Sequence, residues 1–148
     1  MGNFISELKD RFNRGNICLQ FIYINVGIFV VTTLISVFLL LFNWDATSWL
    51  NYLELPAWMP QFWAQPWSVF TYMFLHAGIL HLLFNVLWLY WFGQLFLSFV
   101  SARHFRGLYI LGGLCGGLLY LLAYNVFPSF MAYIYGSSLL GASASVFV

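Results

Sequence analysis

Charged residues are scarce in this chain of 148 residues, in which lysine, arginine, aspartate and glutamate together make up only 6%. A soluble domain of this size carries roughly a quarter charged residues, whereas hydrophobic residues reach 63% here. So few charges cannot cover a folded chain in water, which excludes the soluble globular class. The five basic residues form no dense patch, so the sequence predicts no binding of nucleic acid.

Cysteine is also rare, with only Cys18 and Cys115, and both lie in apolar runs. We expect two buried small hydrophobic side chains and no disulfide framework. Metal-ligand spacing is missing as well, because His76 and His81 would lie about 140° apart around a helix. The sequence therefore predicts no two-histidine metal face.

Long apolar runs are what the chain has instead. Residues 17–42 carry no charge and are long enough for one tilted transmembrane helix, which needs about 20 residues. The run is too long for a signal peptide and lacks a small-residue cleavage site, so a retained anchor is predicted. Further spans are predicted at about 79–99 and 108–126, and an incomplete fourth span at 139–148.

The segments between the spans have a different composition. Residues 43–78 contain prolines and tryptophans, which break helices and favour the membrane interface, so we predict an interfacial outer loop. Residues 1–16 place apolar side chains at helical spacing between charges, which predicts a cytoplasmic amphipathic surface helix. The predicted fold is an all-α polytopic membrane helical bundle with three complete transmembrane helices and the start of a fourth, embedded in a lipid bilayer.

The basic residues indicate the orientation. All of them either precede the first span or lie in a short basic turn predicted at Ser101–Gly107, between the second and third spans. The positive-inside rule then places the N-terminus in the cytoplasm and the tryptophan-rich loop outside. With no organelle-targeting segment in the sequence, we expect a multi-pass protein of the bacterial inner membrane.

Several polar residues fall near the outer ends of these spans. His81 and Asn85 are four residues apart and share one helix face, and Ser143 enters the membrane from the same side, after Gly141. Taken singly, the first two favour an interhelical hydrogen-bond pair and the serine favours helix packing through small residues. Taken together, they offer a serine nucleophile beside donors for an oxyanion.

Ser145 is the rival nucleophile. It would lie about 200° around a helix from Ser143, so both serines cannot face His81. Four glycines of the third span have small-xxx-small spacing and are expected to let helix backbones approach closely, without a chemical role. These are Gly112, Gly113, Gly116 and Gly117.

In this order and on these spans, the residues resemble the rhomboid family of intramembrane serine proteases. The matching stretches are "HAGILHLLFNVLWLYWFG" (His76–Gly93) and "GASA" (Gly141–Ala144). The family pattern has a histidine in the first loop, His-x-x-x-Asn at the start of the second helix and Gly-x-Ser-x at the start of the fourth. The aromatic first loop and the glycine-rich third helix also fit, so a partial rhomboid domain is expected over 17–148.

The resemblance implies a role for each matching residue. Ser143 would be the nucleophile, and His81, Asn85 and the Ser143 backbone amide would form the oxyanion hole. His76 would support the loop, and Gly141 would allow close packing around the nucleophile. Family members use no metal or cofactor, and they hydrolyse peptide bonds in or near transmembrane segments of other membrane proteins.

The family's catalytic base is a histidine on the sixth helix, and the resemblance assigns that role to none of the three histidines here. His104 falls in the predicted cytoplasmic turn, a membrane thickness from Ser143. We therefore expect this chain to be the N-terminal part of a longer protease, truncated within its fourth helix and with little or no activity as it stands. The alternative is a non-catalytic rhomboid-like protein that binds transmembrane helices. The oligomeric state is not predicted.

Overall fold

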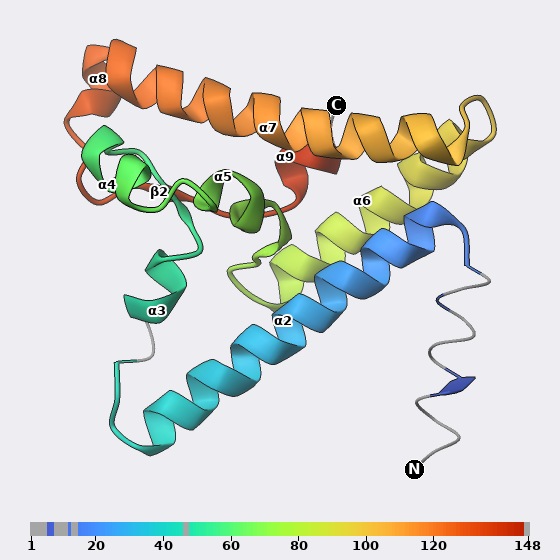
Figure 1. Cartoon of the computed structure of the whole chain (residues 1–148), viewed down its shortest axis with the longest axis horizontal. Helices are drawn as coiled ribbons and strands as arrows, with labels where there is room; N and C mark the ends of the chain where they lie inside the picture. Colours follow the sequence, from blue (N-terminus) through green and yellow to red (C-terminus); the bar gives the residue numbers. More distant parts are fainter. Residues whose placement is uncertain (1–5, 8–11, 13–14, 46–47, 147–148) are drawn as a thin grey trace.

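Three long helices dominate the computed structural model, which describes residues 6–7, 12, 15–45 and 48–146. They are α2 (Ile17–Leu41), α6 (Ile79–Leu97) and α7 (Ala102–Val126), each long and apolar enough to cross a membrane (Figure 1). The prediction of an all-α membrane bundle with three spanning helices is confirmed. The predicted surface helix over 1–16 lies largely outside the described residues.

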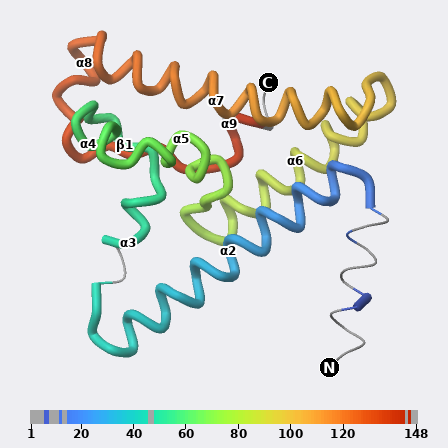
Figure 2. Tube along the Cα trace, viewed as in Figure 1, coloured from blue at the N-terminus to red at the C-terminus, as the bar shows by residue number. Residues whose placement is uncertain are grey.

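The beginning of α2, the end of α6 and the beginning of α7 meet at one end of the bundle. Figure 2 shows α2 and α6 side by side, with α7 leaving them at an angle. Asn16 marks the junction, because its side-chain oxygen caps α2 through the Leu19 N–H and its side-chain amide donates to Gln94 Oε1 at 3.1 Å. The contact between residues at opposite chain ends of α2 and α6 makes these two helices antiparallel.

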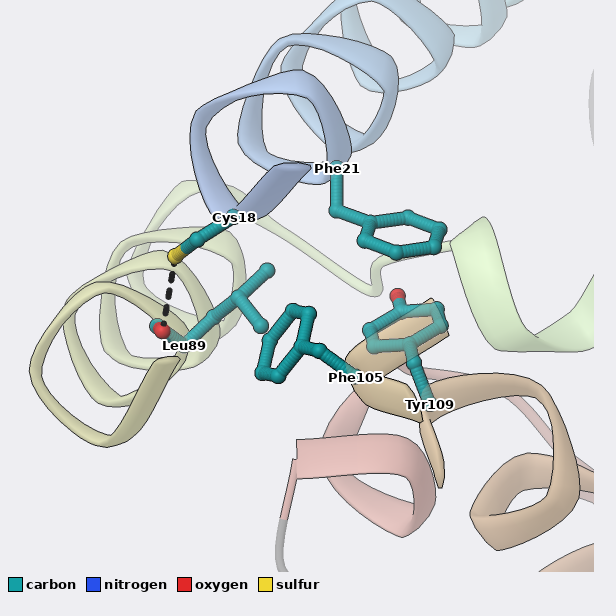
Figure 3. Packing of buried hydrophobic residues seen from close by; sticks show 5 residues of the cluster. All are labelled: Cys18, Phe21, Leu89, Phe105 and Tyr109. Carbon is teal, nitrogen blue, oxygen red and sulfur yellow. Dashed lines mark hydrogen bonds between the residues drawn. The ribbon is translucent and has the colours of Figure 1, made fainter. Parts of the chain in front are cut away.

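A small core holds this junction together (Figure 3). Its buried members come from all three helices and are Cys18, Phe21, Leu89, Phe105 and Tyr109. The rings of Phe21 and Tyr109 stack with their centroids 4.1 Å apart, and the Cys18 thiol donates to the Leu89 carbonyl at 3.2 Å. Cys18 is buried as expected, but Cys115 is exposed on α7 and corrects the prediction that both cysteines are buried. An apolar run in a membrane helix has a lipid-facing side as well as a packed one.

A polar pair lies beside this core inside the membrane-spanning part. Asn25 is 1% exposed, and its amide donates to the Tyr109 hydroxyl at 3.1 Å and to the Phe21 carbonyl at 2.8 Å. Because lipid offers no partner to a polar side chain, such an amide is directed inward and joins neighbouring helices. Asn25 thus connects α2 to α7.

The outer loop between α2 and α6 is built from short elements. They are α3 (Ser48–Asn51), β1 (Leu55–Pro56), α4 (Met59–Ala64), α5 (Ser68–Thr71) and η1 (Tyr72–Phe74). Side chains satisfy the backbone between them: the Gln65 amide donates to the carbonyls of Asn51 at 2.9 Å and Glu54 at 3.2 Å, and the Thr71 hydroxyl donates to the Leu53 carbonyl at 2.6 Å. Irregular backbone next to a membrane needs such partners, so the loop has a defined shape.

A two-residue strand pair corrects the predicted start of the fourth span at residue 139. After α8 (Pro128–Met131), β2 (Ser138–Leu139) pairs antiparallel with β1, with Leu55 opposite Leu139. Helix α9 (Ser143–Val146) begins only after Gly141. The Ala57 N–H extends the pairing to the Ser137 carbonyl at 3.0 Å, so this segment is extended where an apolar pattern alone suggested a helix. We call the β1–β2 pair the clip.

The predicted basic turn at Ser101–Gly107 is also corrected. Helix α7 already begins at Ala102, with Ser101 as its extended N-cap residue, so the connection from α6 is only a few residues long. Alanine and arginine are good helix formers, and arginine side chains can extend from a helix end to the interface. The sequence pattern therefore marked the apolar part of the helix and not its true beginning.

The glycines of α7 permit close packing, but their partners are mostly not other long helices. A Cβ at Gly113 would overlap Met73 Sδ and would lie 2.6 Å from Ser145 Oγ. A Cβ at Gly117 would lie 3.1 Å from Leu55 Cδ2 and 3.2 Å from Tyr72 Cε1. The glycine face of α7 therefore receives the outer loop and the short helix α9.

Replacing Gly93 tests the packing of α2 on α6. A Cβ there would lie 2.5 Å from Cys18 Sγ and 3.2 Å from Phe105 Cζ, and overpacking costs about 1–3 kcal/mol. We expect Gly93→Ala to lower the unfolding free energy in detergent by that order. Gly27→Ala is the matched control, since nothing lies within 4 Å of a Cβ at Gly27. Equal stability of the two variants would contradict the close contact between Gly93 and Cys18.

Candidate active site

Gly141 is the turning point between the clip and α9. Its φ of +123° is a backbone conformation that residues with a side chain rarely adopt. Its N–H donates to the Tyr72 carbonyl at 2.9 Å. A Cβ at this position would lie 2.7 Å from His81 Cε1 and 2.9 Å from His81 Nε2. Only glycine meets both requirements, so Gly141 allows the chain to pass directly against the His81 ring.

His81 and Ser143 meet around this glycine. Ser143 Oγ lies 3.7 Å from the Cβ position of Gly141, and His81 Nε2 lies 2.9 Å from the same point. Ser143 is the first residue of α9, whereas His81 stands in the first turn of α6. The structure thus brings together, on one side of Gly141, two polar residues that are 62 positions apart in the sequence.

One hydrogen bond of the His81 ring indicates which ring nitrogen carries the proton. The Ala77 N–H donates to His81 Nδ1 at 3.4 Å, so Nδ1 is an acceptor. In the neutral ring the proton then sits on Nε2, the atom that lies against Gly141. His81 therefore presents an N–H donor to the space beside Ser143, which suits oxyanion stabilisation better than proton abstraction.

Asn85 follows one helical turn after His81 and is 5% exposed. Its side-chain amide donates to the His81 carbonyl at 2.8 Å. Within the described part of the chain no hydrogen bond joins Asn85 to Ser143, so the structure groups it with His81 and not directly with the serine. Its amide nitrogen carries a second N–H that this bond does not use.

The two serines of α9 point to different surroundings. Ser145 is 7% exposed, and its hydroxyl lies 2.6 Å from the Cβ position of Gly113 on α7. Among the described residues that hydroxyl has no hydrogen-bond partner. Ser143 lies instead beside Gly141, whose Cβ position also contacts the His81 ring.

His76 lies in the loop just before α6, next to the other histidine. The ring centroids of His76 and His81 are 5.4 Å apart and the planes meet at 63°. His76 Nδ1 donates to the Phe74 carbonyl at 3.2 Å, while its Nε2 is buried without a partner in the described residues. Burial, then the nearby His81, lowers the pKa of His76 to about 4, against the opposing effect of the Phe74 carbonyl. His76 is therefore neutral at physiological pH.

A cavity of about 520 Å³ adjoins this group of residues. The loop before α6 and the segment before Gly141 form one wall, through His76, Gly78 and Leu140. Helix α2 forms the opposite wall, and its hydroxyl residues there are Thr32, Thr33 and Ser36. The cavity thus lies between α2 and the segments next to the site, and neither His81 nor Ser143 lines it.

The third histidine lies elsewhere. His104 is exposed in the first turn of α7, where its Nδ1 lies 2.8 Å from Ser101 Oγ. That turn is at the end of the bundle where α2 begins and α6 ends, whereas His81 is at the start of α6. Among the described residues, no group of three histidine, cysteine or acidic side chains could hold a metal ion.

Tyr72 is the residue of this region that the sequence did not reveal. It is completely buried, and its carbonyl accepts the Gly141 N–H. A contact through a main-chain carbonyl leaves no trace in residue type, and one more aromatic residue in an aromatic loop does not stand out. Only its position nine residues before His81 could have drawn attention to it.

Comparison with known proteins gives one match. A family model described as "Rhomboid domain" matches residues 63–148, which is more than half of the chain and contains all of the residues described above around Gly141. No curated protein sequence and no solved structure matches the chain.

The first test of this geometry is Gly141→Ala. The new methyl group would overlap the His81 ring, and alanine at an incompatible positive φ destabilises by more than about 1 kcal/mol. We expect the imidazole NMR signals of His81 to move in histidine-labelled protein, with those of His104 unchanged. Gly136→Ala, where nothing lies within 4 Å of the added Cβ, should move neither. Unmoved His81 signals in Gly141→Ala would refute the close approach.

The second test uses pH. The pKa of His76 falls from 6.5 to about 4 on folding, so between these values the unfolded chain binds a proton that the folded chain does not. Stability should therefore decrease as the pH falls from 6.5 toward 4, by on the order of 1 kcal/mol between pH 7 and pH 5. We expect His76→Gln to lose that part of the slope in denaturant unfolding in detergent. Identical slopes for both proteins would show that His76 is not buried in its neutral form.

Proposed function

The chain belongs to the rhomboid family, and from this premise we propose that it carries the nucleophile and oxyanion hole of an intramembrane serine endopeptidase. It is an integral membrane protein with three spanning helices, in a family whose members are usually serine proteases. The proposed reaction is hydrolysis of peptide bonds in or near transmembrane segments of other membrane proteins.

The observation that carries the proposal is the meeting of His81 Nε2 and Ser143 Oγ around Gly141. Ser143 Oγ would attack the scissile carbonyl carbon, and its proton would pass to a base. The negative oxygen that forms would be stabilised by the Nε2–H of His81, the Asn85 amide and the Ser143 N–H. Expulsion of the amine would leave an acyl-enzyme, which water then hydrolyses.

The base is the part that these 148 residues do not offer. His81 presents a proton donor to Ser143, the low pKa of His76 makes it a weak base, and His104 lies at the other end of the bundle. We propose that a histidine on a further helix supplies the base, as in the family pattern. A cavity of about 520 Å³ lies beside His76 and Leu140, next to the site, which leaves room for a further element near it. The chain by itself is expected to hydrolyse little or nothing.

The proposed orientation places the site at the outer face. Arg103 and Arg106 lie in the first turns of α7, at the end of the bundle opposite to His81. With those arginines in the cytoplasm, Ser143 lies near the external surface, where water can reach it. We propose the bacterial inner membrane as the location and transmembrane segments that unwind readily as substrates.

Serine replacement tests the proposal. The assay uses bacterial membranes that contain the full-length protein encoded by the gene and a substrate with a single membrane span. We expect Ser143→Ala to abolish cleavage and to leave membrane insertion intact. Loss of one oxyanion donor in His81→Ala or Asn85→Ala should lower the rate by about 10²–10³.

Ser145→Ala is the matched control, because Ser145 packs against Gly113 instead of the His81 ring. Cleavage that survives Ser143→Ala and is lost in Ser145→Ala would overturn the choice of nucleophile. Binding of transmembrane peptides without any cleavage would favour a non-catalytic rhomboid-like protein instead.

A further inference from the structure

Tyr72 joins three segments that are distant in the sequence. It is the first residue of η1 in the outer loop and is completely buried. Its hydroxyl donates to the Gly113 carbonyl in the middle of α7. Its own carbonyl accepts the Gly141 N–H at 2.9 Å. Tyr72 therefore connects the membrane-spanning helix α7 to Gly141, which lies between His81 and Ser143.

The lack of a side chain at Gly117 of α7 makes the first of these bonds possible. A helical carbonyl is normally shielded by the side chain that follows one turn later, and here that residue is Gly117. A Cβ at Gly117 would lie 3.4 Å from the Tyr72 hydroxyl and 3.2 Å from its Cε1. The ring thus occupies the room that Gly117 leaves and reaches the second lone pair of the Gly113 carbonyl.

The second bond holds the chain in place shortly before the nucleophile. The clip fixes the chain up to Leu139, and Gly141 is then fixed by its N–H to Tyr72. Two residues later Ser143 begins α9. A shift of the Tyr72 carbonyl would carry Gly141 with it and change how Ser143 faces the His81 ring.

We propose that Tyr72 is a positioning residue for Ser143, in which the phenol anchored on Gly113 holds Gly141, and through it the serine, in register with His81. This role for Tyr72 rests on the proposed function, in which Ser143 is the nucleophile. The structural link from Gly113 through Tyr72 to residue 143 depends only on the two hydrogen bonds of Tyr72, with Gly113 and with Gly141.

The reactivity of a cysteine at position 143 measures how that position lies relative to His81, and this measurement needs no catalytic base. In the 148-residue chain in detergent micelles, the Ser143→Cys variant is treated with iodoacetamide across a pH series. Mass spectrometry of peptides separates the adduct at position 143 from those at Cys18 and Cys115. The Nε2–H of His81 stabilises a thiolate beside it, so the pH midpoint of alkylation measures the alignment of position 143 with that donor.

Adding Tyr72→Phe removes only the bond to Gly113 and keeps the ring. We expect the midpoint to move to higher pH and alkylation at neutral pH to slow by about fivefold, the factor that corresponds to one neutral hydrogen bond. Tyr109→Phe is the matched control, because Tyr109 is also a buried tyrosine of this bundle whose hydroxyl is hydrogen-bonded, to Asn25. It does not touch Gly141, so its alkylation profile should match that of Ser143→Cys alone.

Gly117→Ala is a second variant that leaves the Tyr72 hydroxyl in place but crowds its ring. It should raise the midpoint in the same direction, and it decides the question if Tyr72→Phe does not fold. An unchanged midpoint in the folded Tyr72 variant, or equal shifts in the Tyr72 and Tyr109 variants, would overturn the proposal. Failure of the proposed function looks different: cleavage would not depend on Ser143, while the coupling measured at position 143 would persist.

Discussion

Two glycines one helical turn apart on α7 leave the space into which the outer loop and the helix with Ser143 pack. At Gly113 the chain admits Met73 from the outer loop and Ser145 from α9, and at Gly117 it admits Leu55 and Tyr72. Lipid gives helices no hydrophobic reason to associate, so close contact and polar bonds must hold them. The outer loop, the clip and the short helix with Ser143 all contact α7 at these two glycines.

The opposite end of the bundle is held by a different kind of contact. There the stacked rings of Phe21 and Tyr109 and the buried amide of Asn25 join α2 to α7. The two ends thus differ: one joins the spanning helices to each other, and the other gathers the polar side chains of the candidate site. The glycine contacts in the middle of α7 bring the outer loop close to the segment before α9, where the Tyr72 carbonyl accepts the Gly141 N–H.

The sequence was sufficient for the parts that depend on apolar length and residue type. Uncharged runs revealed the three spans. The helical spacing of His81 and Asn85 and the small residues around Ser143 drew attention to residues that the structure brings together around Gly141. The clip was not foreseen, because a two-residue strand has no periodicity, and an apolar Leu139 suits a helix equally well. The early start of α7 was missed since arginine marks a boundary in hydropathy while favouring the helix itself. Tyr72 was missed because it contacts Gly141 through its main-chain carbonyl, a group that every residue has.

The clip also has a consequence for how the protein is made. The Ser138 hydroxyl donates to the Glu54 carboxylate across 84 positions of the chain, so the segment that precedes Ser143 finds its partner only after α6 and α7 have been synthesised and have crossed the bilayer. Contacts between such distant residues form late, because the intervening loop must close first. During biogenesis, β1 in the outer loop therefore has no partner strand until β2 has been synthesised. The register of Ser143 beside His81 is thus set only after both α6 and α7 are in place.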